Sequence, residues 1–105
     1  MSLERLNELR QLEKEEPNDP FVLYAIGLEL YKSDSFEAAE KQLLKIASVH
    51  TDYCPVFFKL GQWYAEDDRE EDALIYFNKA LLIAEKEKDK KAVNEIKEAI
   101  YMIED

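Results

Sequence analysis

His50 and Cys54 are the two side chains whose types and spacing come nearest to a reactive site. A cysteine beside a histidine forms a nucleophile pair in many enzymes, and both residue types bind zinc. A zinc site needs three or four such ligands, but the sequence holds one histidine and one cysteine. A nucleophile pair also needs donors that stabilise an oxyanion, and no motif supplies them. We therefore predict no metal ligands and no catalytic residues, and we expect His50 to lie at the C-terminal end of a helix, where its charge complements the helix dipole.

The segment 66–72 has a different chemistry, because six of its seven residues are acidic. A row of carboxylates can bind a cation, but a calcium loop also needs a central glycine and a terminal glutamate at set positions, which this segment lacks. We predict an exposed turn whose carboxylates stabilise the N-terminal end of the next helix. The sequence also lacks a glycine-rich phosphate loop, a serine nucleophile elbow and a two-histidine metal motif. We therefore expect no cofactor and no enzymatic activity.

The overall charge and the cysteine content restrict the partners and the compartment. The 105 residues carry a net charge of −10, and an acidic surface repels phosphate backbones, so we do not expect nucleic acid to bind. One cysteine cannot form an internal disulfide, which suits a reducing compartment. The N-terminus has no apolar signal core, and no run approaches the roughly 18 apolar residues of a membrane helix. We expect a cytoplasmic protein without a membrane partner.

The elements that must position any site are helices. Two glycines and three prolines are too few for the many turns of a β-rich fold, and they suit long helices joined by short turns. We predict Asp19 and Asp89 as N-caps, with Pro20 in the first turn of its helix. The short connections favour antiparallel neighbours. The apolar periodicity predicts six helices, at residues 2–15, 20–32, 36–49, 54–66, 70–86 and 90–103.

A repeat organises these helices. Gly27 and Gly61 lie 34 residues apart and occupy the same place in two similar stretches. A fixed period of this length indicates stacked helix pairs. We expect each glycine at the closest approach of its two helices, facing Ala39 and Ala73 respectively, because small residues let two backbones come together. Identities at the same offset include Val22/Val56, Asp34/Asp68, Glu37/Glu71, Ala39/Ala73 and Lys45/Lys79.

The second stretch carries a specific motif, which consists of Phe57, Leu60-Gly61, Tyr64, Ala73, Phe77 and Ala80. This pattern resembles the tetratricopeptide repeat. The first stretch fits it with substitutions, as Leu23, Ile26-Gly27, Leu30, Ala39, Leu43 and Ile46. A preceding half repeat is represented by Leu9, Leu12 and Pro17. The resemblance covers most of the chain, although Thr51 and Glu85 stand where the family has a repeat-ending proline.

The resemblance implies an all-α fold of antiparallel helix-hairpin repeats, a short superhelix of about two and a half repeats. We expect one domain over residues 1–105, with a half repeat at 2–17, repeats at 20–53 and 54–87, and a capping helix at 89–104. The last helix has one apolar and one charged face, as a terminal cap requires. The structural signature residues are Gly27, Ala39, Gly61, Tyr64, Ala73, Phe77 and Ala80. The leading half repeat favours a built-in N-terminal cap over a fragment of a longer array.

A second apolar stripe on the helix at 20–32 is the best functional signal in the sequence. Phe21, Tyr24, Leu28 and Tyr31 form it, on a different side from the residues that pack inside the hairpin. In tetratricopeptide repeat proteins the first helices of successive repeats line a concave groove. The resemblance implies that the groove positions here are Phe21, Tyr24, Leu28, Tyr31, Lys32, Phe58, Lys59 and Gln62.

This stripe leaves three alternatives open. An aromatic groove suits an extended peptide or a helix of a partner protein, which would make the chain an interaction module or scaffold. The same face could instead pair two copies in a homodimer without a separate peptide ligand. Phe21 and Tyr24 could also pack on neighbouring helices as ordinary core residues. The terminal-carboxylate clamp of some family members is not indicated, because Tyr24 and Leu28 stand at its positions.

Overall fold

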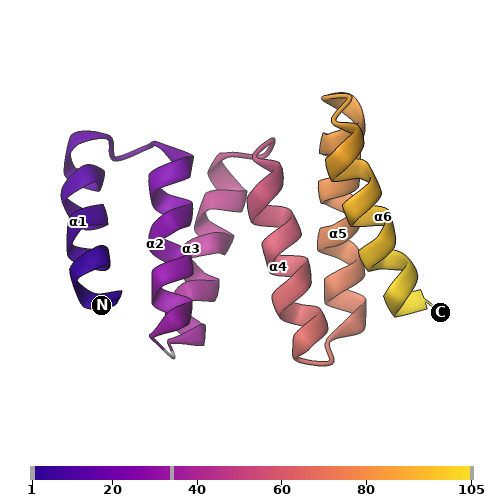
Figure 1. Ribbon diagram of the computed structural model, residues 1–105, viewed down its shortest axis with the longest axis horizontal. Helices are drawn as coiled ribbons and strands as arrows, with labels where there is room; N and C mark the ends of the chain where they lie inside the picture. Colours follow the sequence, from indigo (N-terminus) through magenta and orange to yellow (C-terminus); the bar gives the residue numbers. More distant parts are fainter. Residues whose placement is uncertain (1, 34, 105) are drawn as a thin grey trace. The chain divides into compact units, whose positions relative to one another are not determined.

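The computed structural model describes residues 2–33 and 35–104, and helices are the only regular elements in this part of the chain (Figure 1). Asp34, one half of a repeated pair, lies outside the described residues. The all-α fold class is confirmed, and the helix boundaries agree with the sequence prediction to within one residue. The helices are α1 (Ser2–Glu15), α2 (Pro20–Lys32), α3 (Phe36–Val49), α4 (Cys54–Glu66), α5 (Glu70–Lys86) and α6 (Lys90–Glu104).

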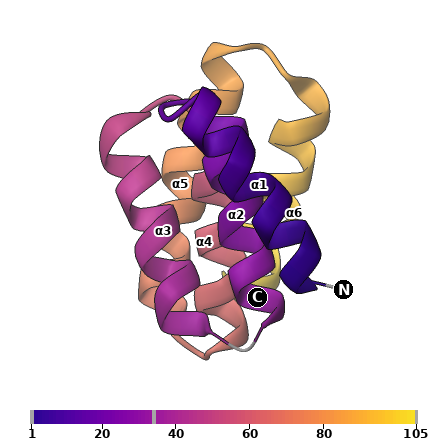
Figure 2. The same ribbon diagram turned by 90° about the vertical axis from the view of Figure 1, so that its left-hand side faces the viewer.

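The helices fall into two compact units, Met1–Thr51 and Asp52–Asp105, which we call unit 1 and unit 2. In unit 1, α2 contacts both α1 and α3 (Figure 2). The contact of α1 with α2 is a small apolar core of Leu9, Val22 and Ile26. These residues recur at helical spacing on one face of each helix, which is why two short helices can bury them against each other.

In unit 2, α5 contacts both α4 and α6. Large side chains of α4 are buried, including Leu60 and Trp63, and the rings of Phe57 and Tyr64 pack against Tyr76 of α5. On α6, Ile96 is fully buried, whereas the charged residues on the opposite side are exposed. The predicted division of this last helix into an apolar and a charged face is therefore confirmed.

Two aspartates cap the N-terminal ends of helices, as predicted from the sequence. The Asp19 side chain accepts a hydrogen bond from the Phe21 backbone N–H at 2.9 Å, and Pro20 follows in the first turn of α2. Asp89 Oδ1 accepts one from the Ala92 N–H at 3.1 Å, at the start of α6. Each bond satisfies a backbone donor that has no partner within the helix.

Two helices end without the glycine that such ends usually use. After α4, Asp68 adopts the left-handed conformation, and the Arg69 N–H donates to the Tyr64 carbonyl at 2.8 Å. After α5, Lys88 also adopts the left-handed conformation, and the Asp89 N–H donates to the Ala84 carbonyl at 3.0 Å. Both are Schellman ends, in which the residue after the cap has positive φ. The missing glycines explain why these ends carry no strong sequence signal.

We expect Lys88→Gly to stabilise the protein by about 1 kcal/mol, because glycine adopts a left-handed conformation without the steric cost that a side chain incurs. Lys86→Gly, two residues earlier and at the last residue of α5, should instead destabilise, by less than the roughly 1 kcal/mol that glycine costs in a helix interior. Thermal unfolding followed by circular dichroism measures both changes. Equal midpoints for the two variants would contradict the left-handed assignment of Lys88.

Within the described residues, every helix is too short or too polar to cross a lipid bilayer.

Candidate functional site

The two glycines lie where the helices of each hairpin come closest. A Cβ atom added to Gly61 would stand 2.5 Å from Cδ1 and 2.6 Å from Cε1 of the Phe77 ring, closer than real carbon atoms approach. A Cβ added to Gly27 would overlap Leu43 Cδ1 in the same way. The close approach confirms the predicted role of the glycines.

The expectation that Ala39 and Ala73 face these glycines needs a correction. The atoms nearest to the missing Cβ belong to Leu43 and Phe77, each one helical turn further along the partner helix. The alanines are fully buried as well. The side chain that lies closest to each glycine is therefore a large one of the second helix.

The remaining signature residues are also buried. Tyr64, Phe77 and Ala80 are almost fully removed from solvent. The Arg69 guanidinium stands 4.3 Å from the centre of the Tyr64 ring, and the Tyr76 ring lies 5.5 Å away, centre to centre. A cation above an aromatic ring is attracted by its negative face. The repeat period gave no sign of this contact, because Arg69 has no counterpart in the first stretch.

The aromatic stripe of α2 reaches the surface of unit 1. Phe21 is 67% exposed and Tyr31 is 37% exposed, while Tyr24 and Leu28 between them are half-buried. Tyr31 also meets Phe36 of α3 edge to face, with 6.2 Å between ring centres. The stripe is thus an apolar surface, and one of its rings, that of Tyr31, is held in place by a contact with α3. Lys32, at its end, is exposed and forms an ion pair with Glu29 at 3.1 Å.

The groove positions predicted on α4 of unit 2 are all half-buried, namely Phe58, Lys59 and Gln62. Phe58 packs against the buried Phe77, with 5.5 Å between ring centres. One side of this ring therefore contributes to the hairpin core. The exposed apolar area is accordingly smaller on α4 than on α2.

The two reactive candidates, Cys54 and His50, lie at helix ends. Burial raises the pKa of the Cys54 thiol, and the charges of Glu87 and Asp89 raise it further, which disfavours the nucleophilic thiolate. Its Sγ donates to the Ala80 carbonyl at 3.5 Å. His50 is the C-cap of α3, as predicted. In the part of the chain that the structure describes, no three histidine, cysteine or acidic side chains are placed to hold a metal ion.

The acidic segment forms the predicted exposed turn. Residues 66–71 are exposed, and three carboxylates, those of Glu70, Glu71 and Asp72, lie in the first turn of α5. Arg69 and Asp72 form an ion pair at 2.9 Å. These carboxylates favour the positive end of the α5 dipole.

Comparison with known proteins identifies this arrangement. No family model matches the sequence, and no curated protein matches it. Among solved structures, the solution structure of a tetratricopeptide repeat domain protein from Salinibacter ruber superposes with a TM-score of 0.79 and 28% identity, over 84% of this chain and 89% of that one. The chain has the tetratricopeptide repeat fold, and the resemblance seen in the sequence is confirmed. A crystal structure of a tetratricopeptide repeat domain protein from the same organism superposes with a TM-score of 0.75 and 28% identity, over 82% of this chain and 96% of that one.

The tetratricopeptide repeat fold accounts for the burial of the signature residues. It also indicates a helical repeat module of the general kind that serves protein interaction. The fold itself does not choose among surfaces or partners. That choice depends on the exposed residues of this particular chain.

Proposed function

We propose that the chain is a protein-interaction module that presents an aromatic surface on α2 to a peptide or helix of a partner protein. The partner surface comprises Phe21, Tyr24, Leu28, Tyr31 and Lys32 of α2. In unit 2, Phe58, Lys59 and Gln62 of α4 are the corresponding positions of the second repeat, and we propose them as a contact surface of that unit.

The exposure of Phe21 carries this proposal. A phenylalanine that remains 67% exposed forgoes most of the stabilisation that burial would give, which amounts to about 1.5–3 kcal/mol for such a side chain. Its neighbours on the stripe, Tyr24 and Leu28, are also only half-buried. A continuous apolar stripe left on the surface of one helix is typical of a contact site for another molecule.

The helix that carries the stripe favours tight recognition. The rest of α2 is anchored by buried residues, with Val22 and Ile26 packed against α1 and Gly27 against Leu43 of α3. The rings are therefore presented by a fixed backbone, and few degrees of freedom remain to be lost when a partner binds. Aromatic side chains add a large contact area at a low cost in rotamer entropy. These features support a preformed site.

The double variant Phe21→Ser/Tyr31→Ser tests the site. It removes the two exposed rings of the stripe and leaves the buried face of α2 intact, so we expect unchanged helical content with loss of partner capture from a lysate of the source organism. The matched control is Ile75→Ser/Leu82→Ser, which removes two similarly exposed apolar side chains of α5, 50% and 70% exposed. The control should retain the captured partner.

Sedimentation of the wild-type chain over a range of concentrations separates a hetero-partner from a second copy. A monomer at high micromolar concentration supports a separate partner. A dimer that the Phe21→Ser/Tyr31→Ser variant abolishes would assign the same surface to self-association. Capture that persists in this variant would contradict the proposed site and place the contact elsewhere.

A further inference from the structure

A small cavity lies in unit 1 away from the aromatic stripe. Its volume is about 110 Å³, and its walls come from the end of α1, the following turn, α2 and α3. None of the proposed groove residues lines it. Three apolar side chains, those of Leu23, Ile46 and Val49, form part of the wall. The space is large enough for the end of one amino-acid side chain.

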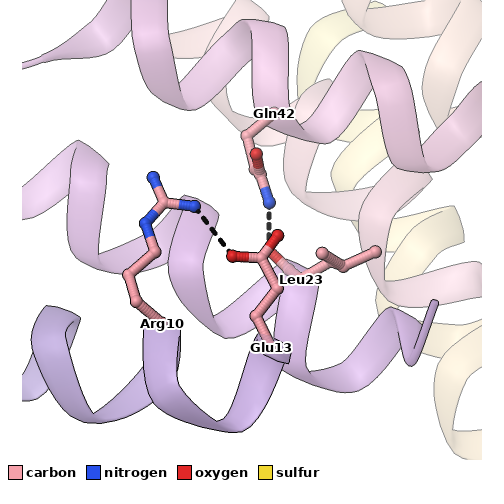
Figure 3. Close-up of polar contacts among 4 residues, drawn as sticks. All are labelled: Arg10, Glu13, Leu23 and Gln42. Atoms are coloured by element: carbon pink, nitrogen blue, oxygen red, sulfur yellow. Dashed lines mark hydrogen bonds and ion pairs between the residues drawn. The ribbon is translucent and has the colours of Figure 1, made fainter. Parts of the chain in front are cut away.

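Hydrogen-bonding groups also face this cavity. Glu13, Gln42 and His50 contribute to the lining. The Gln42 amide donates to the Leu23 carbonyl at 3.0 Å, and Arg10 reaches the Glu13 carboxylate at 3.1 Å (Figure 3). His50 Nε2 is buried and has no hydrogen-bond partner among the described residues. A buried polar atom without a partner is costly, so this nitrogen indicates where a ligand atom would be stabilised.

The electrostatics of the cavity favour a cation. Glu13 lies in the last turn of α1, and Ile46 and Val49 lie in the last turn of α3, so the negative ends of two helix dipoles border the space. Leu23 lies in the first turn of α2 and adds the positive end of one. A neutral imidazole accepts a hydrogen bond at one of its nitrogens. Lys45 is the opposing charge in the lining, but it is exposed, so its methylene stem can form the wall while its ammonium group stays in water.

We propose that this cavity binds the basic side chain of a partner protein, an arginine or a lysine. The apolar wall of Leu23, Ile46 and Val49 contacts the methylene stem. The cationic end donates to the Glu13 carboxylate and to His50 Nε2. The net charge of −10 attracts such a basic partner from a distance. The site lies outside the aromatic stripe and does not depend on that stripe being a docking surface.

Nuclear magnetic resonance of His50 tests the proposal directly, because it is the only histidine of the chain. Nα-acetyl-arginine methylamide is titrated into the protein at pH 8 as the probe. We expect a saturable shift of the His50 ring signals at millimolar concentrations of the probe. The neutral citrulline analogue should bind about fivefold more weakly than the arginine probe, because it lacks the charge-assisted hydrogen bonds. The lysine analogue shows whether an ammonium group serves as well.

Two variants are expected to change the affinity for the arginine probe in opposite directions, which a merely structural role for these residues would not produce. Glu13→Gln should weaken binding of the arginine probe about two- to fivefold, the scale of a partly exposed ion pair. Arg10→Gln should strengthen it by a similar factor, because Arg10 competes with the probe for Glu13. Glu15→Gln, an exposed acidic residue outside the cavity, serves as the control and should leave binding unchanged.

An unchanged His50 signal throughout the arginine titration would overturn the proposal and leave the cavity to water. Stronger binding of Nα-acetyl-glutamate methylamide would overturn it as well, because that result would assign the site to an acidic side chain. Circular dichroism of each variant confirms that its helices are retained, so that lost binding is not mistaken for lost folding.

Discussion

Gly61→Leu is expected to destabilise the protein by about 3 kcal/mol, the upper end of the usual cost of inserting atoms into a filled core. The first added atom already lies within 3.0 Å of three carbons of the Phe77 ring. Phe77 is buried and cannot turn away without moving α5. For a domain of this size the melting temperature should fall by roughly 12–24 °C.

Fluorescence of Trp63, the only tryptophan and a buried residue of unit 2, measures this effect during thermal unfolding. Asn78→Leu adds the same side chain at an exposed position of α5 and should change the stability by no more than about 0.5 kcal/mol. If Gly61→Leu melts at the same temperature as the wild type, the close approach of α4 to α5 at this point is wrong.

A double-mutant cycle isolates the contact between these two positions. Gly61→Ala would gain about 1 kcal/mol in an exposed helix, so a net loss would itself reveal the clash with the ring. Combining it with Phe77→Val, which lacks the clashing ring atoms, should cost less than the sum of the two single changes. Strict additivity would show that the two positions do not contact each other.

Ile26→Ala is the second change for which we expect a large effect, about 2–5 kcal/mol of stability. Ile26 is fully buried between α1 and α2, beside Leu9 and Val22. Shortening it removes apolar contact and leaves a cavity that two helix backbones cannot readily close. The midpoint of thermal unfolding, followed by circular dichroism at 222 nm, measures the loss.

Leu12→Ala is the control for this second change, because Leu12 is an exposed leucine of α1. It should cost less than about 1 kcal/mol, as surface substitutions generally do. A similar loss for both variants would contradict the assignment of Ile26 to the core. Following Ile26→Ala by Trp63 fluorescence as well shows whether unit 1 and unit 2 unfold in one transition, because coincident midpoints are the mark of two-state behaviour.

Local signals explain why so much of the fold could be predicted from the sequence. The helix at 20–32 begins with Asp19 and Pro20, and a cap and a fixed φ act within one turn of the chain. The spacing of Gly27 and Gly61 fixes the hairpin period, because glycine tolerates a close backbone approach. These features need no knowledge of distant residues.

Other features depend on contacts between helices, and the sequence does not reveal them. Whether Ala39 or Leu43 faces Gly27 depends on the displacement of α3 along α2, which a repeat period does not define. The cavity beside His50 is formed by Glu13, Gln42 and other residues from separate elements, so no motif indicates it. The ends of α4 and α5 were predicted, but the left-handed conformation of Asp68 and Lys88 was not, since neither residue is glycine.

The pairing of a glycine with a large side chain across each hairpin has a consequence for how the two positions can change during evolution. Any lineage that acquires a side chain at position 61 must lose ring atoms at position 77, so these two sites should change together among descendants. The first hairpin, with Leu43 opposite Gly27, holds an aliphatic group where the second holds an aromatic one. Between the two hairpins of this chain the glycine is thus the same, and the side chain next to it differs.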